Sequence, residues 1–134
     1  MSAGTTGPDR HVVVVVGGAC SGAEAAATLA ASGITVVVLE QNARPFGKIE
    51  DGLPRWHKKQ RLQEYEKVTA RLSHPGIHFV PLTKMGLDLE FDELAKQWGA
   101  SAVLLAHGSW KDRPLGIPEV EAFIGRGFYY QNPF

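Results

Sequence analysis

A run of five valines, Val12 to Val16, constrains the fold of this chain more than any other feature. A short β-branched run without polar alternation is typical of a strand buried on both faces, as in a parallel sheet. An alanine-rich segment, Ala23 to Ala31, then favours a helix, and a second apolar run follows at Ile34 to Leu39. Both junctions are marked by glycines, namely Gly17, Gly18, Gly22 and Gly33. Strand, glycine turn, helix and strand in this order predict a βαβ unit.

Composition limits the class of protein and its partners. The 134 residues suffice for one domain with a core, and 44% of them are hydrophobic. Lys and Arg number 14 and Asp and Glu also 14, so the formal net charge is zero, and we expect neither nucleic acid nor an anionic membrane as a partner. The single cysteine, Cys20, excludes an internal disulfide and any zinc site built from cysteine pairs. A reducing, cytoplasmic setting fits this composition.

The apolar stretch also raises a membrane or export alternative, because Glu24 is the only charged residue between Val12 and Leu39. Four glycines and several Ser and Thr residues interrupt the stretch, however, and the apolar part of a signal peptide would be only the five valines. We therefore expect neither membrane insertion nor export.

The remaining segments predict more helices and strands. We expect residues 1 to 10 to form a flexible tail and residues 41 to 55, which contain two prolines and two glycines, to form a loop. A helix is expected at Trp56 to Leu72, with Leu62, Tyr65, Val68 and Leu72 on one side. Later segments predict strands at Ile77 to Leu82, Met85 to Leu89 and, buried, Ala102 to Ala106, and a helix at Phe91 to Trp98. The predicted class is α/β, with a doubly wound parallel sheet.

The turn after the valine run is a candidate phosphate-binding loop. In the Rossmann fingerprint G-x-G-x-x-G, the first glycine makes the tight turn, the second lets the backbone approach the pyrophosphate, and the third lets the helix pack on the strand. Gly17 and Gly22 occupy the first and third positions, but Ala19 occupies the second. We expect the site to tolerate the extra methyl group if Ala19 keeps a negative φ, and to be weakened if it needs a positive one.

Glu40 ends the second strand, 18 residues after Gly22. A carboxylate at this place hydrogen-bonds the hydroxyls of an adenosine ribose and repels a 2′-phosphate, so the predicted nucleotide is FAD or NAD rather than NADP. Two alternatives stay open. Glycine turns and alanine-rich helices also occur in βαβ units that bind no ligand, and Glu40 could be merely the solvated end of a strand.

Single residues with reactive side chains give weaker signals. Cys20 lies at the expected helix N-terminus, but with no second cysteine to resolve an oxidised form we favour a packing role over reactivity. His107, beside Gly108, is expected to be a loop residue or a contact to a flavin rather than a proton shuttle. The other histidines have no ligand spacing, so no metal site is predicted.

Several motifs in order resemble a known family. They are VVVVVGGACSGAEAAATLAASGITVVVLEQNARPFG, then GLP, then AVLLAHGSWKDRPLGIPE. Together they resemble the FAD-binding region of flavoprotein oxidoreductases with two dinucleotide-binding domains, and most of all the adrenodoxin reductase and glutamate synthase small-subunit group. The resemblance covers roughly residues 11 to 119. Residues 11 to 134 are thus expected to form an FAD-binding, Rossmann-like domain, or the N-terminal part of one.

The resemblance implies a set of cofactor-binding residues. The diphosphate of FAD would lie along Gly17, Gly18, Ala19, Cys20, Ser21 and Gly22, and the adenosine ribose on Glu40 beside Gln41. Gly47 and Lys48 would lie along the ribityl and flavin side, and Thr83 would touch the adenine. Ala106, His107 and Gly108 replace the group's A-T-G and would border the diphosphate or flavin, with Trp110 nearby. Ala19, His107 and Glu119 depart from the group's pattern at single positions.

The implied chemistry is hydride transfer from NAD(P)H, bound at a site outside this chain, to FAD and then to an acceptor. Members of the group have several hundred residues, so this chain is expected to be inactive alone and to need the rest of the enzyme, a partner subunit or a second copy. Aromatic residues near the C-terminus would make that contact: Phe123, Phe128, Tyr129, Tyr130 and Phe134. An iron–sulfur electron carrier is a further partner that the resemblance allows. The alternative function is a non-catalytic nucleotide-binding or interaction subunit that docks on a larger partner.

Overall fold

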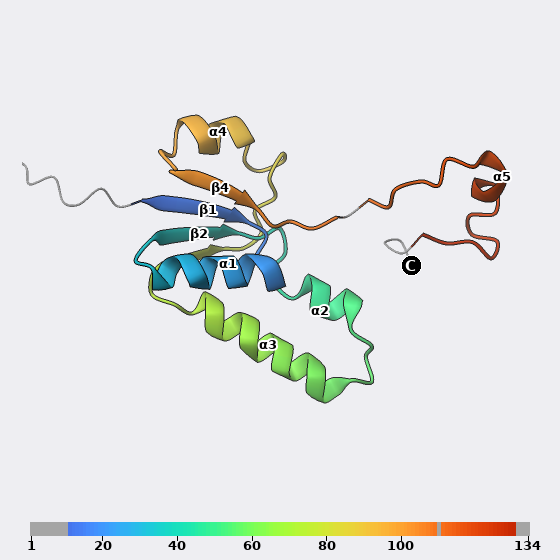
Figure 1. The fold of residues 1–134 in the computed structure, drawn as a ribbon, viewed down its shortest axis with the longest axis horizontal. Helices are drawn as coiled ribbons and strands as arrows, with labels where there is room; N and C mark the ends of the chain where they lie inside the picture. The colour runs from blue at the N-terminus through green and yellow to red at the C-terminus, as the bar shows by residue number, and fades with distance from the viewer. Residues whose placement is uncertain (1–10, 110, 131–134) are drawn as a thin grey trace, which may run out of the picture.

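A four-stranded parallel sheet forms the centre of the computed structural model, which describes residues 11–109 and 111–130. The strand order is β3-β2-β1-β4, and all three neighbouring pairs are parallel (Figure 1). The strands are β1 (Val12–Val16), β2 (Thr35–Leu39), β3 (Ile77–Val80) and β4 (Ala102–Leu105). In the register, Val14 of β1 lies between Val37 of β2 and Val103 of β4. The predicted α/β class with a parallel sheet is confirmed.

Helices lie on both faces of this sheet, as a doubly wound fold requires. The first face is covered by α1 (Cys20–Ala31), with α3 (Lys58–Leu72) packed beside it. The opposite face is covered by the short α4 (Phe91–Lys96), next to β4 (Figure 1). Two more short helices, α2 (Gly47–Gly52) and α5 (Pro118–Glu121), do not cover the sheet.

The two faces of the sheet take alternate residues of the same strands, because successive side chains of a strand point to opposite sides. Val13 and Val15 of β1 pack with Ala26 and Ala30 of α1. Val14 and Val16 pack with the fully buried Leu94 of α4. This explains why the valine run lacks polar alternation: the four valines from Val13 to Val16 each pack in a hydrophobic core.

The structure corrects several local expectations. The segment expected to be a loop contains α2, and Met85 and Leu89 form only an isolated bridge instead of a strand. Leu62, expected on the buried side of α3, is exposed, whereas Val68 on the same helix is buried. The strand β4, expected to be buried, is largely exposed, and Leu105 has 57% of its surface accessible. The exposure of β4 arises because it is an edge strand, paired only with β1 among the described residues.

The C-terminal segment from residue 111 runs away from the sheet and carries α5 at a distance from it (Figure 1). Its exposed apolar side chains are Leu115, Ile117, Phe123, Ile124 and Tyr129. Phe128 and Tyr130 are half-buried against each other, with ring centroids 5.3 Å apart. The expected tail at residues 1 to 10 and the aromatic Phe134 lie outside the described residues.

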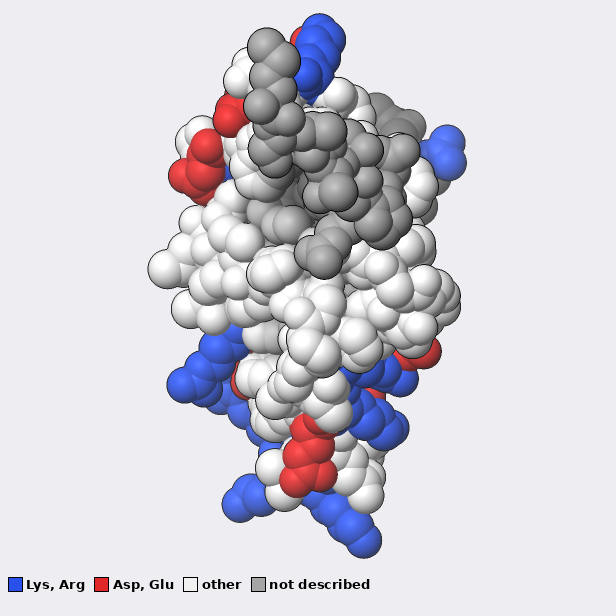
Figure 2. Space-filling view, turned by 90° about the vertical axis from the view of Figure 1, so that its left-hand side faces the viewer, with Lys and Arg blue, Asp and Glu red and all other residues white. Residues whose placement is uncertain are grey.

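Figure 2 shows the face on which the strands begin. Lys and Arg side chains gather at its lower end, the end at which α3 lies, with acidic side chains among them, and the middle of the face is largely uncharged. No helix in residues 11–109 or 111–130 is long and apolar enough to cross a membrane.

Candidate functional site

The glycine turn connects the carboxyl end of β1 to the first residue of α1. Gly17 has φ +102°, and a Cβ atom there would lie 2.6 Å from the carbonyl oxygen of Ala106, at the end of the neighbouring β4. At Gly22, a Cβ atom would lie 1.7 Å from the carbonyl oxygen of Gly17. The first and third fingerprint positions therefore need glycine here, one for backbone conformation and contact and the other for helix packing.

Ala19, at the second fingerprint position, has a conformation that alanine adopts without strain. It is the N-cap residue of α1, with φ −74° and ψ −162°. Its carbonyl oxygen accepts the first hydrogen bond of the helix from the Ala23 N–H group, at 2.8 Å. The negative φ satisfies the condition set from the sequence, so the turn does not require a glycine at this position.

Glu40 is buried, with 5% of its surface accessible, which contradicts the alternative of a solvated strand end. One carboxylate oxygen accepts a hydrogen bond from the Gly18 N–H at 2.9 Å. The other accepts two from Asn42, from its backbone N–H at 2.9 Å and its side-chain amide at 3.0 Å. A carboxylate offers about four acceptor positions, so Glu40 both fastens the turn and keeps capacity for another donor. Asn42 was not among the residues predicted from the sequence, although its place two residues after Glu40 fits a local side-chain-to-backbone turn.

A cavity of about 430 Å³ opens at the carboxyl ends of the strands. This edge, where the strand order reverses around β1, is the usual ligand position in doubly wound sheets. The predicted residues that line the cavity are Gly17, Ala19, Cys20, Ser21, Glu40, Gln41, Gly47, Lys48, Thr83, Ala106, His107 and Gly108. They come from five separate segments of the chain, which the fold brings together.

Two of the predicted residues do not line this cavity, and a third is not described by the structure. Gly18 is buried behind the wall, where a Cβ atom would meet Phe79, Pro45 and Val38 within 3.3 Å. Gly22 is buried under the turn. Trp110 lies outside the described residues.

The cavity combines apolar walls with a few charged groups. Val16, Leu39, Met85, Phe91 and Leu105 supply apolar surface that the sequence did not assign to the site. Lys84 also lines the cavity, so that two lysines, Lys48 and Lys84, share the lining with the first residues of α1. A helix N-terminus carries free N–H groups and a partial positive charge, and these lysines add to the attraction for an anionic ligand.

Cys20 and His107 are both exposed, unlike a residue with a purely structural role in the core. Cys20 is exposed and lines the cavity, so the predicted packing role is wrong. Its position explains this, because the first residue of α1 faces the ligand side of the turn rather than the sheet. His107 lies in the loop after β4 and is also exposed, at the cavity wall. Among the residues described by the structure, no group of His, Cys, Asp and Glu side chains could hold a metal ion.

Comparisons with known proteins agree with this geometry. The family model described as "NAD(P)-binding Rossmann-like domain" matches residues 15–76, the segment from β1 to the residue before β3. The chain therefore has a Rossmann-like fold, and its segment from β1 to the residue before β3 is similar to this NAD(P)-binding family. A solved structure of a variant of FprA from Mycobacterium tuberculosis has the same fold, with a TM-score of 0.69, 24% identity and coverage of 81% of this chain and 25% of that one.

Two curated relatives that are similar to this chain have the same name. The glutamate synthase [NADPH] small chain of Bacillus subtilis is 32% identical over 118 residues, which are 88% of this chain and 22% of that protein. The protein of the same name from Mycobacterium tuberculosis is 30% identical over 113 residues, 83% of this chain and again 22% of that protein. The resemblance drawn from the motifs is confirmed. The chain spans about a fifth of the length of these relatives.

Proposed function

We propose that this chain binds FAD at the carboxyl edge of its sheet and serves as the FAD-binding part of an NAD(P)H-dependent oxidoreductase. The observation that carries the proposal is the convergence of the glycine turn, Glu40, Lys48 and the loop after β4 on one cavity. A βαβ unit without a ligand needs the glycine turn, but it does not need a hollow lined by the other three segments.

The order of the strands supports one orientation of the proposed ligand. The ends of β2, β1 and β4 follow one another along the edge, so Glu40, the glycine turn and the segment Ala106–Gly108 do so too. An adenosine ribose on Glu40 places the diphosphate at the turn and the N-terminus of α1. The rest of the dinucleotide then extends toward Gly108 and Lys48.

The residues present fit this group. Glu40 keeps one acceptor position for a ribose hydroxyl, Ala19 has a negative φ, and the two lysines of the lining favour an anionic ligand. Bound flavin would supply hydride acceptance from NAD(P)H and transfer of electrons to an acceptor. The chain itself would hold the dinucleotide, orient it along the strand ends and cover it with the apolar walls of Leu39, Met85 and Phe91.

The relatives are about five times as long as the matched region, so we place the NAD(P)H site in further polypeptide outside this chain. That polypeptide would be the rest of the enzyme, a partner subunit or a second copy, and the electron acceptor would be a partner such as an iron–sulfur carrier. The exposed strand β4 and the C-terminal segment are the surfaces it would cover. We propose a cytoplasmic location on the evidence of the single cysteine.

The single cysteine gives a direct test, because Cys20 lines the cavity and the chain has no other thiol. We expect saturating FAD or ADP to slow alkylation of Cys20 by iodoacetamide about tenfold, while NADP, with its 2′-phosphate near Glu40, protects less. Alkylation of free N-acetylcysteine under the same conditions is the control for effects on the reagent. Equal alkylation rates with and without FAD, together with no FAD binding in equilibrium dialysis, would overturn the proposal.

A second candidate function has one observation in its favour. The C-terminal segment exposes five large apolar side chains away from the sheet, as expected for a module whose main task is to dock on a partner. Such an interaction subunit would bind nucleotide without turnover. A colourless purified protein that takes up no added FAD but forms a stable complex with a partner would favour it.

A further inference from the structure

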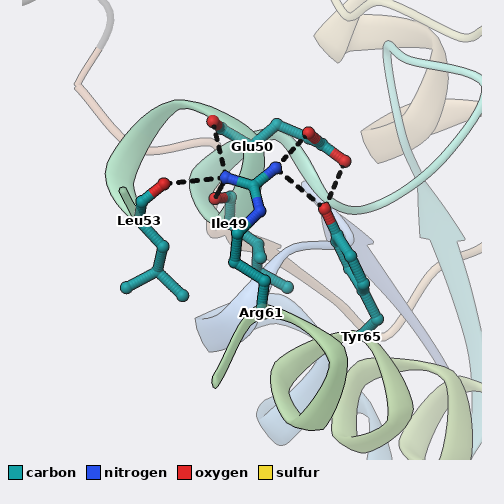
Figure 3. A network of polar contacts seen from close by, with 5 residues as sticks. All are labelled: Ile49, Glu50, Leu53, Arg61 and Tyr65. Carbon is teal, nitrogen blue, oxygen red and sulfur yellow. Dashed lines mark hydrogen bonds and ion pairs between the residues drawn. The ribbon is translucent and has the colours of Figure 1, made fainter. Parts of the chain in front are cut away.

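Arg61, on α3, donates five hydrogen bonds, four of them to the end of α2 and one to Tyr65 on its own helix (Figure 3). One guanidinium nitrogen donates to the carbonyl oxygens of Ile49, Glu50 and Leu53, at 3.1, 3.2 and 2.7 Å. The other donates to the Glu50 carboxylate at 2.5 Å and to the Tyr65 hydroxyl at 3.0 Å. Tyr65 in turn donates to the second oxygen of Glu50, at 2.5 Å, which closes the network. The Arg61 side chain is only 12% exposed, so this network is partly shielded from water.

The helix α2 needs this support because it has only six residues. A helix so short is unstable alone, and its last carbonyl groups have no partner within the helix. Arg61 supplies donors to three carbonyls at the end of α2, of which that of Ile49 also accepts a hydrogen bond from the Leu53 N–H. The second attachment is apolar: Ile49, 2% exposed, packs with Ala23 of α1 and Val68 of α3.

The opposite end of α2 reaches the cavity. Gly47 and Lys48, its first two residues, line the wall. A Cβ atom added at Gly108 would lie 3.7 Å from the Cε atom of Lys48, so the lysine stem reaches across to the loop after β4. The position of α2 therefore sets where Lys48 lies, on the side of the cavity away from Glu40.

We propose that Arg61 is a positioning residue for the dinucleotide site: by fastening the end of α2 it fixes Gly47 and Lys48 against the half of the ligand that extends beyond the diphosphate. This inference rests on the proposed binding of FAD. It assigns a role to a side chain that does not line the cavity, and it makes a prediction that a general loss of stability does not make.

That prediction concerns the two halves of the dinucleotide. ADP occupies the Glu40 and glycine-turn part of the site, which α2 does not form, whereas FAD also extends to Lys48. If loss of the network leaves α2 correctly placed one-tenth of the time, the apparent dissociation constant for FAD rises tenfold. The dissociation constant for ADP stays within twofold.

The test compares three variants of the full chain with the wild type. Arg61→Gln removes the network, Arg61→Lys keeps a positive charge but cannot reach three carbonyls and a carboxylate together, and Arg71→Gln is the matched control. Arg71 lies on the same helix and forms an ion pair with Glu24 of α1, so its loss weakens α3 without touching α2. Dissociation constants for FAD and ADP are measured by calorimetry, and hydrogen exchange is followed in peptides that cover residues 46–55.

We expect Arg61→Gln to raise the FAD dissociation constant about tenfold, to leave that of ADP within twofold and to speed exchange in residues 46–55. Arg61→Lys should give an intermediate, about threefold, rise for FAD, and Arg71→Gln should change neither constant more than twofold.

Unchanged FAD binding in Arg61→Gln, or equal weakening for FAD and ADP, would overturn the positioning role while leaving the proposed function intact. A wild-type chain that binds neither nucleotide would instead overturn the proposed function, and the inference with it. If Arg61→Gln does not fold, the FAD-to-ADP ratio in Arg61→Lys decides, and a ratio equal to that of the wild type counts against the role.

Discussion

At the scale of single residues, the site depends on backbone conformation as much as on side-chain chemistry. Gly17 and Gly33 both have positive φ, +102° and +83°, but only Gly17 is enclosed, since nothing lies within 4 Å of a Cβ atom at Gly33. The pair therefore separates two costs that usually occur together: the strain of the left-handed region and the collision of a side chain with its neighbours.

We expect Gly17→Ala to lower the free energy of unfolding by about 3 kcal/mol or more, because strain and contact with the Ala106 carbonyl add. Gly33→Ala, the control, should cost about 1 kcal/mol, from strain alone. Urea denaturation followed by circular dichroism measures both. Equal losses for the two variants would mean that β4 moves freely away from the turn.

Ala19 allows a test of the methyl group beside the diphosphate. Its φ is already negative, so Ala19→Gly removes the methyl without relieving strain, and glycine is also the better N-cap residue. We expect FAD binding to stay equal or to tighten by up to about fivefold, measured by calorimetry. Clear weakening would show that FAD does not pass along this turn.

The Glu50–Tyr65 pair predicts a pH dependence of stability. The hydrogen bond from Tyr65, with the nearby Arg61 charge, lowers the pKa of Glu50 from 4.5, and the same hydrogen bond raises the pKa of Tyr65 from 10.0. For Glu50 the stabilisation is present above its unfolded pKa and lost as the pH falls through the lowered value. For Tyr65 it is present below its unfolded pKa and lost as the pH rises through the raised value.

The difference in unfolding free energy between wild type and Tyr65→Phe should therefore be constant from about pH 5 to pH 9 and shrink below and above that window. Denaturation curves across this range measure it. Lys67→Gln, which removes an exposed pair with Glu64 on the same helix, is the control and should show little difference at any pH. A difference that persists unchanged at pH 3 would contradict the assignment of the hydrogen bond to the charged carboxylate.

At the scale of elements, a buried side chain anchors α2, whereas an apolar side chain on the neighbouring α3 is exposed. Ile49 is 2% exposed in the cluster with Ala23 and Val68, whereas Leu62 on α3 is 57% exposed. We expect Ile49→Ala to cost about 2–4 kcal/mol, because it opens a cavity between three helices, and Leu62→Ala to cost about 0.5 kcal/mol or less. Chemical denaturation measures both, and similar losses would show that α2 is not anchored through Ile49.

The sequence predicted the elements that depend on local pattern and missed those that depend on contacts. The valine run and the glycine turn carry their periodicity and punctuation within a few residues, so the βαβ unit and its fingerprint could be read directly. The helix α2 could not, since its support comes from Arg61, more than ten residues away. The exposure of β4 was equally hidden, because the apolar run AVLLA predicts a buried strand but does not show that β4 is an edge strand, paired only with β1 among the described residues.

The residues of the candidate site divide in the same way, into those that belong to a local motif and those that depend on contacts in the fold. Gly17, Gly22 and Glu40 belong to a spaced motif, and their positions could be inferred from the chain alone. Other lining residues reach the cavity only because β2, β3 and α4 meet at one edge of the sheet, as Asn42, Lys84 and Phe91 do. No spacing in the sequence predicts them. Cys20 was misjudged because burial on a helix depends on which way its first turn faces.

At the scale of the whole molecule, the proposed function gives the chain one dinucleotide site, whereas hydride transfer between two dinucleotides needs two. The sequence contains one glycine fingerprint, and one such βαβ unit holds one dinucleotide. Reaction requires the nicotinamide to lie within about 3.5 Å of the flavin, which a second binding site must arrange. The exposed Leu105 on β4 and Phe123 near α5 are consistent with surfaces that pack on further polypeptide.

We therefore expect the 134-residue chain alone not to oxidise NADH or NADPH at a measurable steady-state rate, even with added FAD and an artificial acceptor. Light scattering of the same sample should show association, because two copies of the chain can bury the exposed apolar side chains of the C-terminal segment against each other. Replacing Phe123 and Ile124, both exposed on that segment, with serine should return the chain to a monomer without changing its FAD affinity, since neither residue lines the cavity. Flavin-dependent turnover by a clean monomer would contradict both the need for a second site and the role of the segment.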